Sequence, residues 1–493
     1  MSASRRPCLI GVAQRTVHPE EGPAPEPLDL WEELTRAAAA DSGGHDVAEA
    51  IDDVNVVYSL SWVYDDAPGR LAERLGLGPG GRRTSTMSGA SAQKMLTSAA
   101  ARIAQGECDL ALVAGAESLA TRRAMRKAGE SPDWSHPCAG KPNPPFDDPF
   151  HRTEIVHQVM QAYVTFALFD VARRAHLGIA PAEYLQQNGE LFAPMTEVAA
   201  HNPNAWFRQV RTVDELTRVT ADNRMVAHPY PKNLVAIMDI DMGSALLLAS
   251  EEKADALGVP RDRRVYLRGW CNTKDVPRVA ERRDLFRSAG MEEAARVALA
   301  GAGVGFDDIG HLDLYSCFPS SVNFARDALG MRSEDGRVVT VTGGLPYHGG
   351  PGSNYLGHSI ATLVERLRED PDTYGLATGV GMHMVNHSYA VYSGRPGEIE
   401  IPNEAAAQER TAAAEECVIR DAATGPARVA TYSVVHGREG RRFGVAVCDL
   451  PDGERCYAQT ESQDLMEEME AAEWVGSEIE LEDGGEGINR IAG

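Results

Sequence analysis

The chain has 493 residues, 43% of them hydrophobic, which is enough for two or three packed units of ordinary globular composition. A formal net charge of −24 disfavours contact with phosphate backbones, so nucleic acid is a poor candidate partner. No apolar run approaches the length of a membrane-spanning helix, and the eight cysteines form no CxxC pair, so we expect no membrane span, no structural zinc site and a cytoplasmic location.

The first 118 residues alternate β-rich runs with helical patterns. The run "CLIGVAQ" (8–14) predicts a first strand rather than a signal peptide. Strands separated by helices predict a parallel or mixed sheet that is covered by helices. The bend "TMSGAS" (86–91) precedes the helical pattern 93–106, and such a junction often presents a nucleophile to substrate in α/β enzymes.

From about residue 119 to 235 the pattern gives way to a long excursion rich in proline, histidine and aromatic residues. A stretch of that length inside a compact domain is usually a functional lid or a binding subdomain. Regular structure resumes in the apolar run 233–250.

A second unit then repeats the order of the first. Strand patterns at 263–270 and 311–318 flank a helix at 291–303, and a glycine-rich stretch and a further strand region follow. The shared order predicts an internal duplication. After residue 400, a polar linker leads to period-two runs separated by Gly- and Asp-bearing turns, which predict a small antiparallel β-barrel.

Four motifs in this order resemble the thiolase superfamily over roughly residues 5–397. They are "MSGASAQKML" (87–96), "DLYSCFPS" (313–320), "GGLPYHGGPGSN" (343–354) and "GLATGVGMH" (375–383). The resemblance implies an α/β fold of two βαβαβαββ halves in an αβαβα sandwich. It divides the chain into a first half (1–118 and 236–262), a loop subdomain that binds coenzyme A (119–235), a second half (263–398) and an additional β-barrel domain (405–493). The last resembles the C-terminal domain of type-one thiolase-like proteins of the sterol-carrier-thiolase branch, whose usual label is acetyl-CoA acetyltransferase and whose setting is lipid metabolism.

The thiolase catalytic groups are absent from the matching positions. The nucleophilic cysteine falls on Gly89, the catalytic histidine on Gly350, and the second cysteine on Gly379 or Val380, depending on register. Since the thiolate and the proton-transfer groups carry most of the rate in such chemistry, we expect no thiolase activity.

Tyr315 and His348 are the residues that could supply a replacement chemistry. Tyr315 occupies the asparagine position of the second motif, with Ser316 at the glutamate position. Thiolase-like steroid side-chain aldolases, which this part of the chain resembles, break carbon–carbon bonds without the cysteines, and the resemblance suggests proton transfer by a tyrosine here. The alternatives are a packed strand tyrosine and a histidine bonded to buried backbone.

A metal site is not expected. His383 and His387 are four residues apart, a spacing that binds metal only on a helix, and "MHMVNHSY" (382–389) carries no helix signal. Hydrogen bonding to buried backbone is the alternative role for both.

Residues for binding a CoA ester come from three short stretches. Arg122, Arg123 and Lys127 lie in a basic run that could contact phosphates, or could equally be a solvated helix face. Ser88 and Ser91 flank Gly89 and could instead cap the following helix. Gly343 and Gly344 allow backbone to approach a ligand closely.

Three functions remain open from the sequence. The first is a thiolase-like protein that binds acyl-CoA, with no covalently bound cofactor, and lacks thiolase activity. The second is a carbon–carbon lyase or atypical acyltransferase on a CoA ester that uses Tyr315 and His348. The third is a non-catalytic assembly protein that acts through its β-domain, since the aldolases associate with a separate β-barrel partner. A homodimer is also possible.

Overall fold

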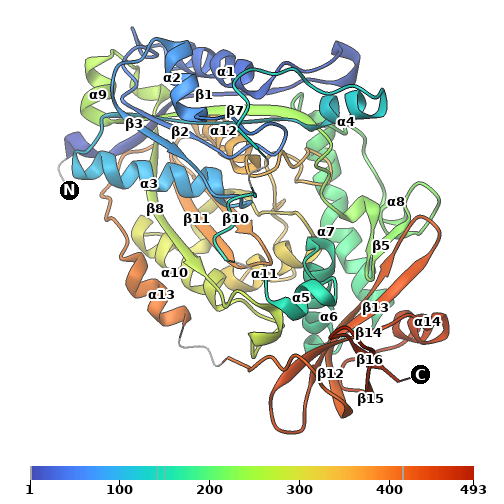
Figure 1. Cartoon of the computed structure of the whole chain (residues 1–493). Helices are drawn as coiled ribbons and strands as arrows, with labels where there is room; N and C mark the ends of the chain where they lie inside the picture. The colour runs from blue at the N-terminus through green and yellow to red at the C-terminus, as the bar shows by residue number, and fades with distance from the viewer. Residues whose placement is uncertain (1–2, 141–142, 149, 413–415, 493) are drawn as a thin grey trace.

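A nine-stranded sheet organises the molecule, and a computed structural model describes it for residues 3–140, 143–148, 150–412 and 416–492. The first half of the chain supplies β1 (Pro7–Thr16), β2 (Asp53–Val56), β3 (Gly81–Thr84), β4 (Leu110–Ser118) and β7 (Asp241–Ser250). The second half supplies β8 (Val265–Lys274), β9 (Ile309–Asp313), β10 (Tyr374–Gly381) and β11 (Asn386–Ser393). Their order across the sheet is β3-β2-β4-β7-β1-β8-β11-β10-β9 (Figure 1).

The strand order confirms the predicted duplication. From its outer edge inward, the first half has its strands in the order third, second, fourth, fifth, first. If the third position of the second half is left empty, its four strands follow the same order from the other edge: second, fourth, fifth, first. Residues 330–354 of the second half contain no strand, and only a hydrogen bond from Leu314 N to Val339 O (2.8 Å) marks the missing third position. The halves join where β1 pairs with β8 through Cys8 and Leu9.

Helices form three layers around the strands. The helices of the two halves are α1 (Pro27–Asp41), α2 (Ala67–Leu75), α3 (Ser91–Gln105), α9 (Glu251–Ala256), α10 (Ala289–Ala302), α11 (Pro319–Leu329) and α12 (Tyr355–Glu369). Helices α3 and α12 pack against strands of both halves, whereas α1 and α2 cover the first half and α10 covers the second (Figure 1). The arrangement is the expected αβαβα sandwich.

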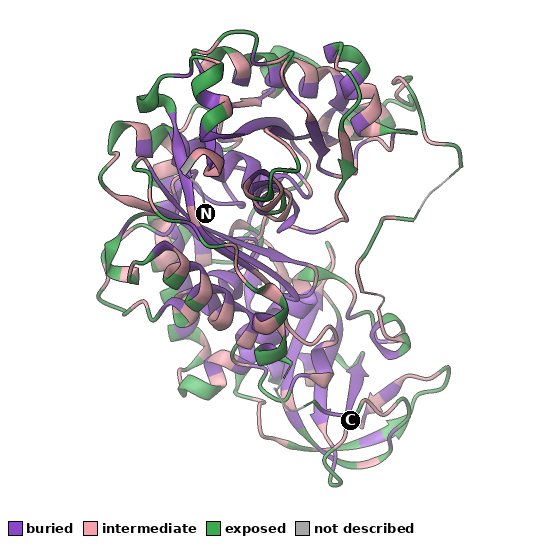
Figure 2. Cartoon of the chain, turned by 90° about the vertical axis from the view of Figure 1, so that its left-hand side faces the viewer, coloured by how far each residue is buried: buried purple, intermediate pink, exposed green. Residues whose placement is uncertain are grey.

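Burial follows from this layering. Every residue of β4, β7 and β11 is buried, because helices cover both faces of these strands (Figure 2). The side of α3 that faces the core carries Ala92, Ala99 and Ala100, and these small side chains let the strands and α12 approach closely.

The stretch 119–235 differs from the irregular excursion that its sequence indicated. It contains α4 (Leu119–Lys127), α5 (Arg152–Val156), α6 (Ala162–Leu177), α7 (Pro181–His201) and α8 (Val213–Thr217), followed by the short strands β5 (Met225–Ala227) and β6 (Tyr230–Pro231). Helix α6 is buried along most of its length, so its apolar residues do not follow the one-sided period of a surface helix.

The C-terminal region confirms the predicted barrel. It consists of α13 (Glu404–Thr411), β12 (Gly425–His436), β13 (Arg441–Asp449), β14 (Arg455–Thr460), α14 (Gln463–Ala471), β15 (Glu478–Asp483) and β16 (Asn489–Ile491). The five strands close through pairing of β12 with β13, and all pairs are antiparallel except β14 with β16. Strand β5 from the 119–235 stretch adds to the edge of β12 through Ala227 and Val435.

The barrel is bonded to the rest of the chain by buried polar side chains. Arg174 of α6 pairs with Glu473 at 2.9 Å and also bonds the Tyr432 hydroxyl at 3.3 Å. Arg455 of β14 donates to the backbone carbonyls of Arg282 and Arg283. The barrel is therefore connected to the rest of the protein by contacts along β12 and β14 as well as by the polypeptide linker. No helix in the described part of the chain is long and apolar enough to cross a membrane.

Candidate functional site

The four thiolase-like motifs converge where the C-terminal ends of β9 and β10 meet the N-terminal ends of α3 and α12. Gly89 precedes α3, Tyr315 follows β9, Val380 lies near the end of β10, and Gly350 lies in the loop before α12. Because β9 and β10 are parallel, their carboxyl ends reach the same edge of the sheet. Loops that follow such ends are the common place for a binding site in α/β folds.

Position 89 has no room for a side chain. A Cβ added at Gly89 would overlap the Tyr315 hydroxyl and the Val380 carbonyl oxygen, and would lie 2.6 Å from Tyr315 Cζ. The tyrosine therefore stands where a nucleophilic side chain would have to be.

The other two vacated positions are also filled by neighbours. A Cβ at Gly379 would lie 2.6 Å from Leu356 Cδ1, and one at Gly350 would lie 3.1 Å from Leu345 Cδ2. Val380, the alternative match for the second cysteine, is itself buried in the core. Leucine side chains are thus the nearest neighbours of both glycines.

Burial shapes the chemistry of Tyr315. The residue is 5% exposed, and desolvation raises the pKa of its phenol well above its ordinary value. A base role needs a shift in the opposite direction. At neutral pH the hydroxyl keeps its proton and can donate a hydrogen bond.

His348 belongs to the glycine-rich loop before α12, but its side chain lies in the protein interior. It is fully buried, and desolvation lowers its pKa to about 4, so the ring is neutral at pH 7. Its Nδ1 lies 3.4 Å from Gly349 O, and its Nε2 has no hydrogen-bond partner. The ring meets that of His358 edge to face at 5.2 Å and that of Tyr355 at 5.9 Å. Tyr355 in turn meets Tyr315 at 5.6 Å, so aromatic packing separates the two sequence-predicted catalytic residues.

A buried carboxylate supports this aromatic group. Asp313, at the end of β9, accepts hydrogen bonds from the hydroxyls of Tyr355 (2.9 Å) and Thr340 (2.9 Å) and from Val341 N (3.1 Å). Burial raises its pKa, while these bonds lower it in part. Ser316, next to Tyr315, accepts from Leu345 N at 3.0 Å and so holds the glycine-rich loop.

The predicted serine and glycine ligands are already engaged within the fold. Ser88 Oγ accepts a hydrogen bond from Ala90 N at 3.3 Å, and Ser91 Oγ donates to Thr86 O at 2.7 Å. Both act locally at the start of α3. Gly343 and Gly344 are buried under Ala199 and Met195 of α7.

The basic run forms a pocket with α4 as one wall. The pocket has a volume of about 580 Å³, and its lining includes Trp62, Arg122, Arg123, Arg126, Glu130 and Asp239. Arg122 donates to Leu60 O at 2.9 Å, and Arg123 is paired with Asp239. Lys127, at the exposed end of α4, is not part of this wall.

The pocket lies close to the vacated histidine position along the chain. Asp239 is two residues from Ile237, whose carbonyl accepts a hydrogen bond from Gly350 N at 2.8 Å. The segment 237–239 thus joins the arginine-lined pocket to the site.

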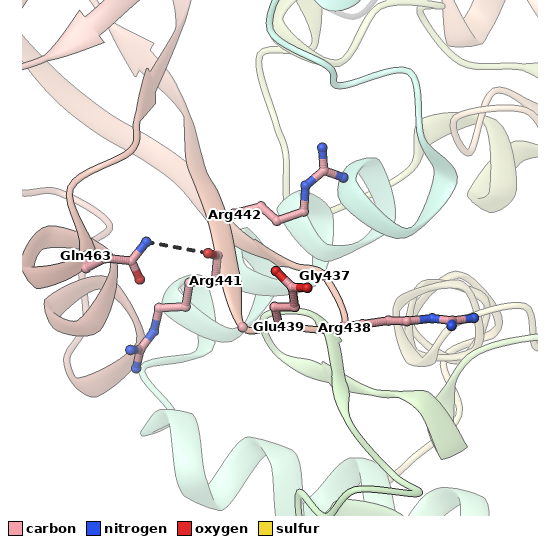
Figure 3. Close-up of a pocket in the computed structure, with 7 residues that line it drawn as sticks. Gly437, Arg438, Glu439, Arg441, Arg442 and Gln463 are labelled. Carbon is pink, nitrogen blue, oxygen red and sulfur yellow. Dashed lines mark hydrogen bonds between the residues drawn. The ribbon is translucent and has the colours of Figure 1, made fainter.

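A second basic pocket, at the tip of the β12–β13 hairpin, is less convergent (Figure 3). Arg441 is paired there with Glu470, and its side chain points away from those of Arg438 and Arg442. All the residues that line this pocket belong to the barrel, and none belongs to the thiolase-like motifs.

His383 and His387 serve different contacts. His387 Nε2 lies 2.9 Å from Asp275 Oδ2 on the α10 side of the sheet. Burial alone would raise the pKa of Asp275, but the hydrogen bond from His387 and the charges of His387 and Arg282 lower it to about 2. His383 packs against Phe150 at 4.7 Å. Among the described residues, no group of three or more His, Cys, Asp or Glu is placed to hold a metal ion.

Asn386, directly before His387, has no predicted role. Its side chain is fully buried, and neither its Nδ2 nor its Oδ1 has a hydrogen-bond partner. No sequence motif could have revealed that this amide lacks hydrogen-bond partners, because its neighbours come from segments that only the fold brings together.

The structure has a thiolase fold in which the positions predicted for the nucleophile and the proton-transfer groups are crowded by neighbouring residues. No protein-family model and no curated protein matches the chain. Among solved structures, a monomeric SCP2-thiolase-like protein type 1 from Mycobacterium smegmatis is similar over 100% of both chains, with 33% identity and a TM-score of 0.87. On that similarity the chain belongs to the SCP2-thiolase-like proteins of the thiolase superfamily.

Two more distant structures share the fold. An Ltp2–ChsH2 (DUF35) aldolase matches 79% of this chain and 98% of its own, with 18% identity and a TM-score of 0.62. An acetyl-CoA acetyltransferase from Syntrophomonas wolfei matches 79% and 99%, with 15% identity and a TM-score of 0.55.

The crowding at position 89 generates the first prediction. Gly89→Ala should destabilise the protein by about 1–3 kcal/mol, because the new methyl group forces Tyr315 or β10 to move. Urea unfolding measures the change. In a Tyr315→Leu background the same substitution should cost less, and the double-mutant cycle isolates that coupling.

Gly78→Ala is the matched control, since a Cβ there meets nothing within 4 Å and the residue is exposed. Equal stability of the two alanine variants would show that position 89 is not crowded.

Proposed function

We propose that this protein binds an acyl-CoA or related CoA ester and does not catalyse the thiolase reaction. The observation that carries the proposal is the close approach of Tyr315 to Gly89, which leaves no attacking atom in a site whose four motifs still converge. The Syntrophomonas protein, which shares the fold, is named an acetyl-CoA acetyltransferase.

The arginine-lined pocket supports binding of the nucleotide part of such a ligand. Guanidinium groups match phosphate oxygens in geometry and charge, and Trp62 offers an aromatic wall beside them. A chain with a net charge of −24 would otherwise repel an anionic ligand.

Coenzyme A binding tests this directly. We expect a dissociation constant on the order of micromolar to millimolar by calorimetry, weakening with added salt because the contacts are charge-based. Arg126→Gln should weaken binding about tenfold, the loss of one charge-assisted contact.

Arg36→Gln serves as the matched control, because Arg36 pairs with Glu32 on the exposed face of α1. No heat and no thermal shift at millimolar CoA would refute the CoA-binding function. The assembly role through the β-domain would then be favoured.

Thiolase activity should be at background with acetoacetyl-CoA and free CoA. Cys317, the cysteine closest in sequence to Tyr315, is buried, and desolvation raises its pKa to about 12, so it forms no thiolate at neutral pH. Gly89→Cys alone should restore little, since Gly350 and Gly379 still lack an imidazole and a second thiol. Loss of acetoacetyl-CoA absorbance measures the rate, and an acyl group trapped on any cysteine would contradict the expectation.

A carbon–carbon lyase is the second candidate, favoured by the Tyr315 hydroxyl at the position of the missing nucleophile. One of the structures that share the fold is named an aldolase, although at 18% identity that likeness concerns the fold alone. With its proton retained, Tyr315 could donate a hydrogen bond to the carbonyl or enolate oxygen as the bond breaks. The Tyr355 ring lies between His348 and Tyr315, so His348 would influence the reaction only indirectly.

Aldehyde release from a β-hydroxyacyl-CoA tests the lyase. Tyr315→Phe should reduce any release by about a hundredfold while leaving the unfolding temperature within a few degrees, because the ring still packs. Phe318→Tyr, on the adjacent segment, controls for general changes in packing. A wild-type protein that releases no aldehyde would leave CoA-ester binding as the function.

A further inference from the structure

Asn386 carries the most unusual polar group near the site. It is the first residue of β11 and is 0% exposed, yet neither end of its amide makes a hydrogen bond. A buried amide without partners costs free energy on both its donor and its acceptor side. Native structures retain such a group when water, an ion or a ligand completes its hydrogen bonds.

The register of the sheet shows which way this side chain points. Asn386 lies directly opposite Gly381 of β10, and opposed residues of an antiparallel pair project to the same face. A Cβ at Gly381 would lie 3.2 Å from Gly89 N and would overlap the Ser88 hydroxyl. The Asn386 amide therefore points toward the start of α3, beside Gly89.

The next residues along β11 agree with this direction. Ser388 lies on the same face, and its hydroxyl bonds Gln93 of α3 at 3.2 Å. His387, between them, points to the opposite face and meets Asp275. The alternation is that of a regular strand, so no bulge reverses the position of Asn386.

The surroundings of the amide favour a neutral, carbonyl-bearing ligand over an anion. Gly381 contributes no side chain beside it, and the neutral Ser88 hydroxyl lies where a Cβ of residue 381 would be. On the other side Asn386 is opposite Lys274, whose ammonium is engaged by Asp148 at 3.0 Å. Gly89 is only partly buried, whereas Ser88 and Ala90 on either side of it are buried, so the solvent-exposed surface of this segment is at position 89.

We propose that the Asn386 amide binds the carbonyl oxygen of the acyl thioester, beside Gly89, at the acyl end of the CoA ester. The proposal rests on CoA-ester binding as the function. The Nδ2 group donates to the thioester oxygen, a contact that free CoA, which has a thiol in place of the thioester, cannot make. Asn386 is thus the residue that distinguishes acylated from free CoA.

Paired binding measurements with acetyl-CoA and free CoA test the proposal. The wild type should bind acetyl-CoA roughly tenfold more tightly than CoA, the gain from one hydrogen bond to a buried amide. Asn386→Leu, which is apolar and of similar size, should abolish that difference and leave the affinity for CoA unchanged. The free variant should be at least as stable as the wild type, because the substitution removes an unpartnered polar group.

A spectroscopic measurement adds a readout that a structural role would not move. Carbonyl-labelled acetyl-CoA should show its thioester stretch at lower frequency when bound to the wild type, and at its unbound frequency in Asn386→Leu. Ser388→Ala, on the same face of β11, is the control and should retain both the shift and the affinity ratio.

The outcomes separate the two proposals. If CoA binds but the acetyl-CoA to CoA ratio is the same in wild type and Asn386→Leu, the role of Asn386 is refuted and CoA-ester binding stands. A strong loss of stability in the free variant would also refute it, since the amide would then have partners within the protein. If neither compound binds the wild type, the proposed function fails as a whole.

Discussion

Tyr315 and Gly89 touch across the boundary between the two halves of the fold, and the rest of the site is arranged around that contact. The tyrosine comes from the end of β9 in the second half, and the glycine precedes α3 in the first. Because the phenol and the Val380 carbonyl fill the space above the helix start, no larger residue fits at position 89. The thiolase scaffold is thus retained with its central position closed by an aromatic ring.

Enclosure of that ring determines its chemistry. The rings of Tyr315, Tyr355 and His348 pack edge to face, one against the next. Desolvation raises the pKa of both tyrosines and lowers that of the histidine, so each favours its neutral form. Neutral groups in a dry interior donate and accept hydrogen bonds but exchange protons poorly at neutral pH. This electrostatic setting suits recognition of a polar but uncharged group better than it suits acid–base catalysis by Tyr315 and His348.

The C-terminal barrel contributes to the site through Arg282. Arg455 of β14 bonds the Arg282 carbonyl, and the Arg282 side chain donates to the carbonyls of His383 (3.0 Å) and Met384 (2.9 Å). Those two residues lie in the turn between β10 and β11, and Met384 adopts a positive φ of 55°. A non-glycine residue in that conformation persists where its surroundings hold it, and here the holding group is itself bonded to the barrel. The barrel therefore supports the hairpin that carries Val380 and Asn386.

Much of the fold could be predicted from the sequence, because strand and helix periods and the order of four motifs are properties of short segments. The duplicated order and the terminal barrel were predicted in this way, and the αβαβα layers were implied by the resemblance to thiolases. Helices α6 and α7 were missed, since α6 is buried along most of its length and so lacks the one-sided pattern of a surface helix. The pairing of β5 with β12 was also missed, because it joins residues more than two hundred positions apart.

The sequence by itself determined which chemical groups are available at each motif: glycine at Gly89, Gly350 and Gly379, and a phenol at Tyr315. The chemical identity of a side chain is fixed by its covalent structure and does not depend on folding. Only the tertiary structure decided that the Tyr315 ring fills position 89, that Arg123 is paired with Asp239, and that the Asn386 amide is left without partners. Desolvation, pairing and crowding depend on segments brought together from across the chain, so they emerge only when both halves are packed.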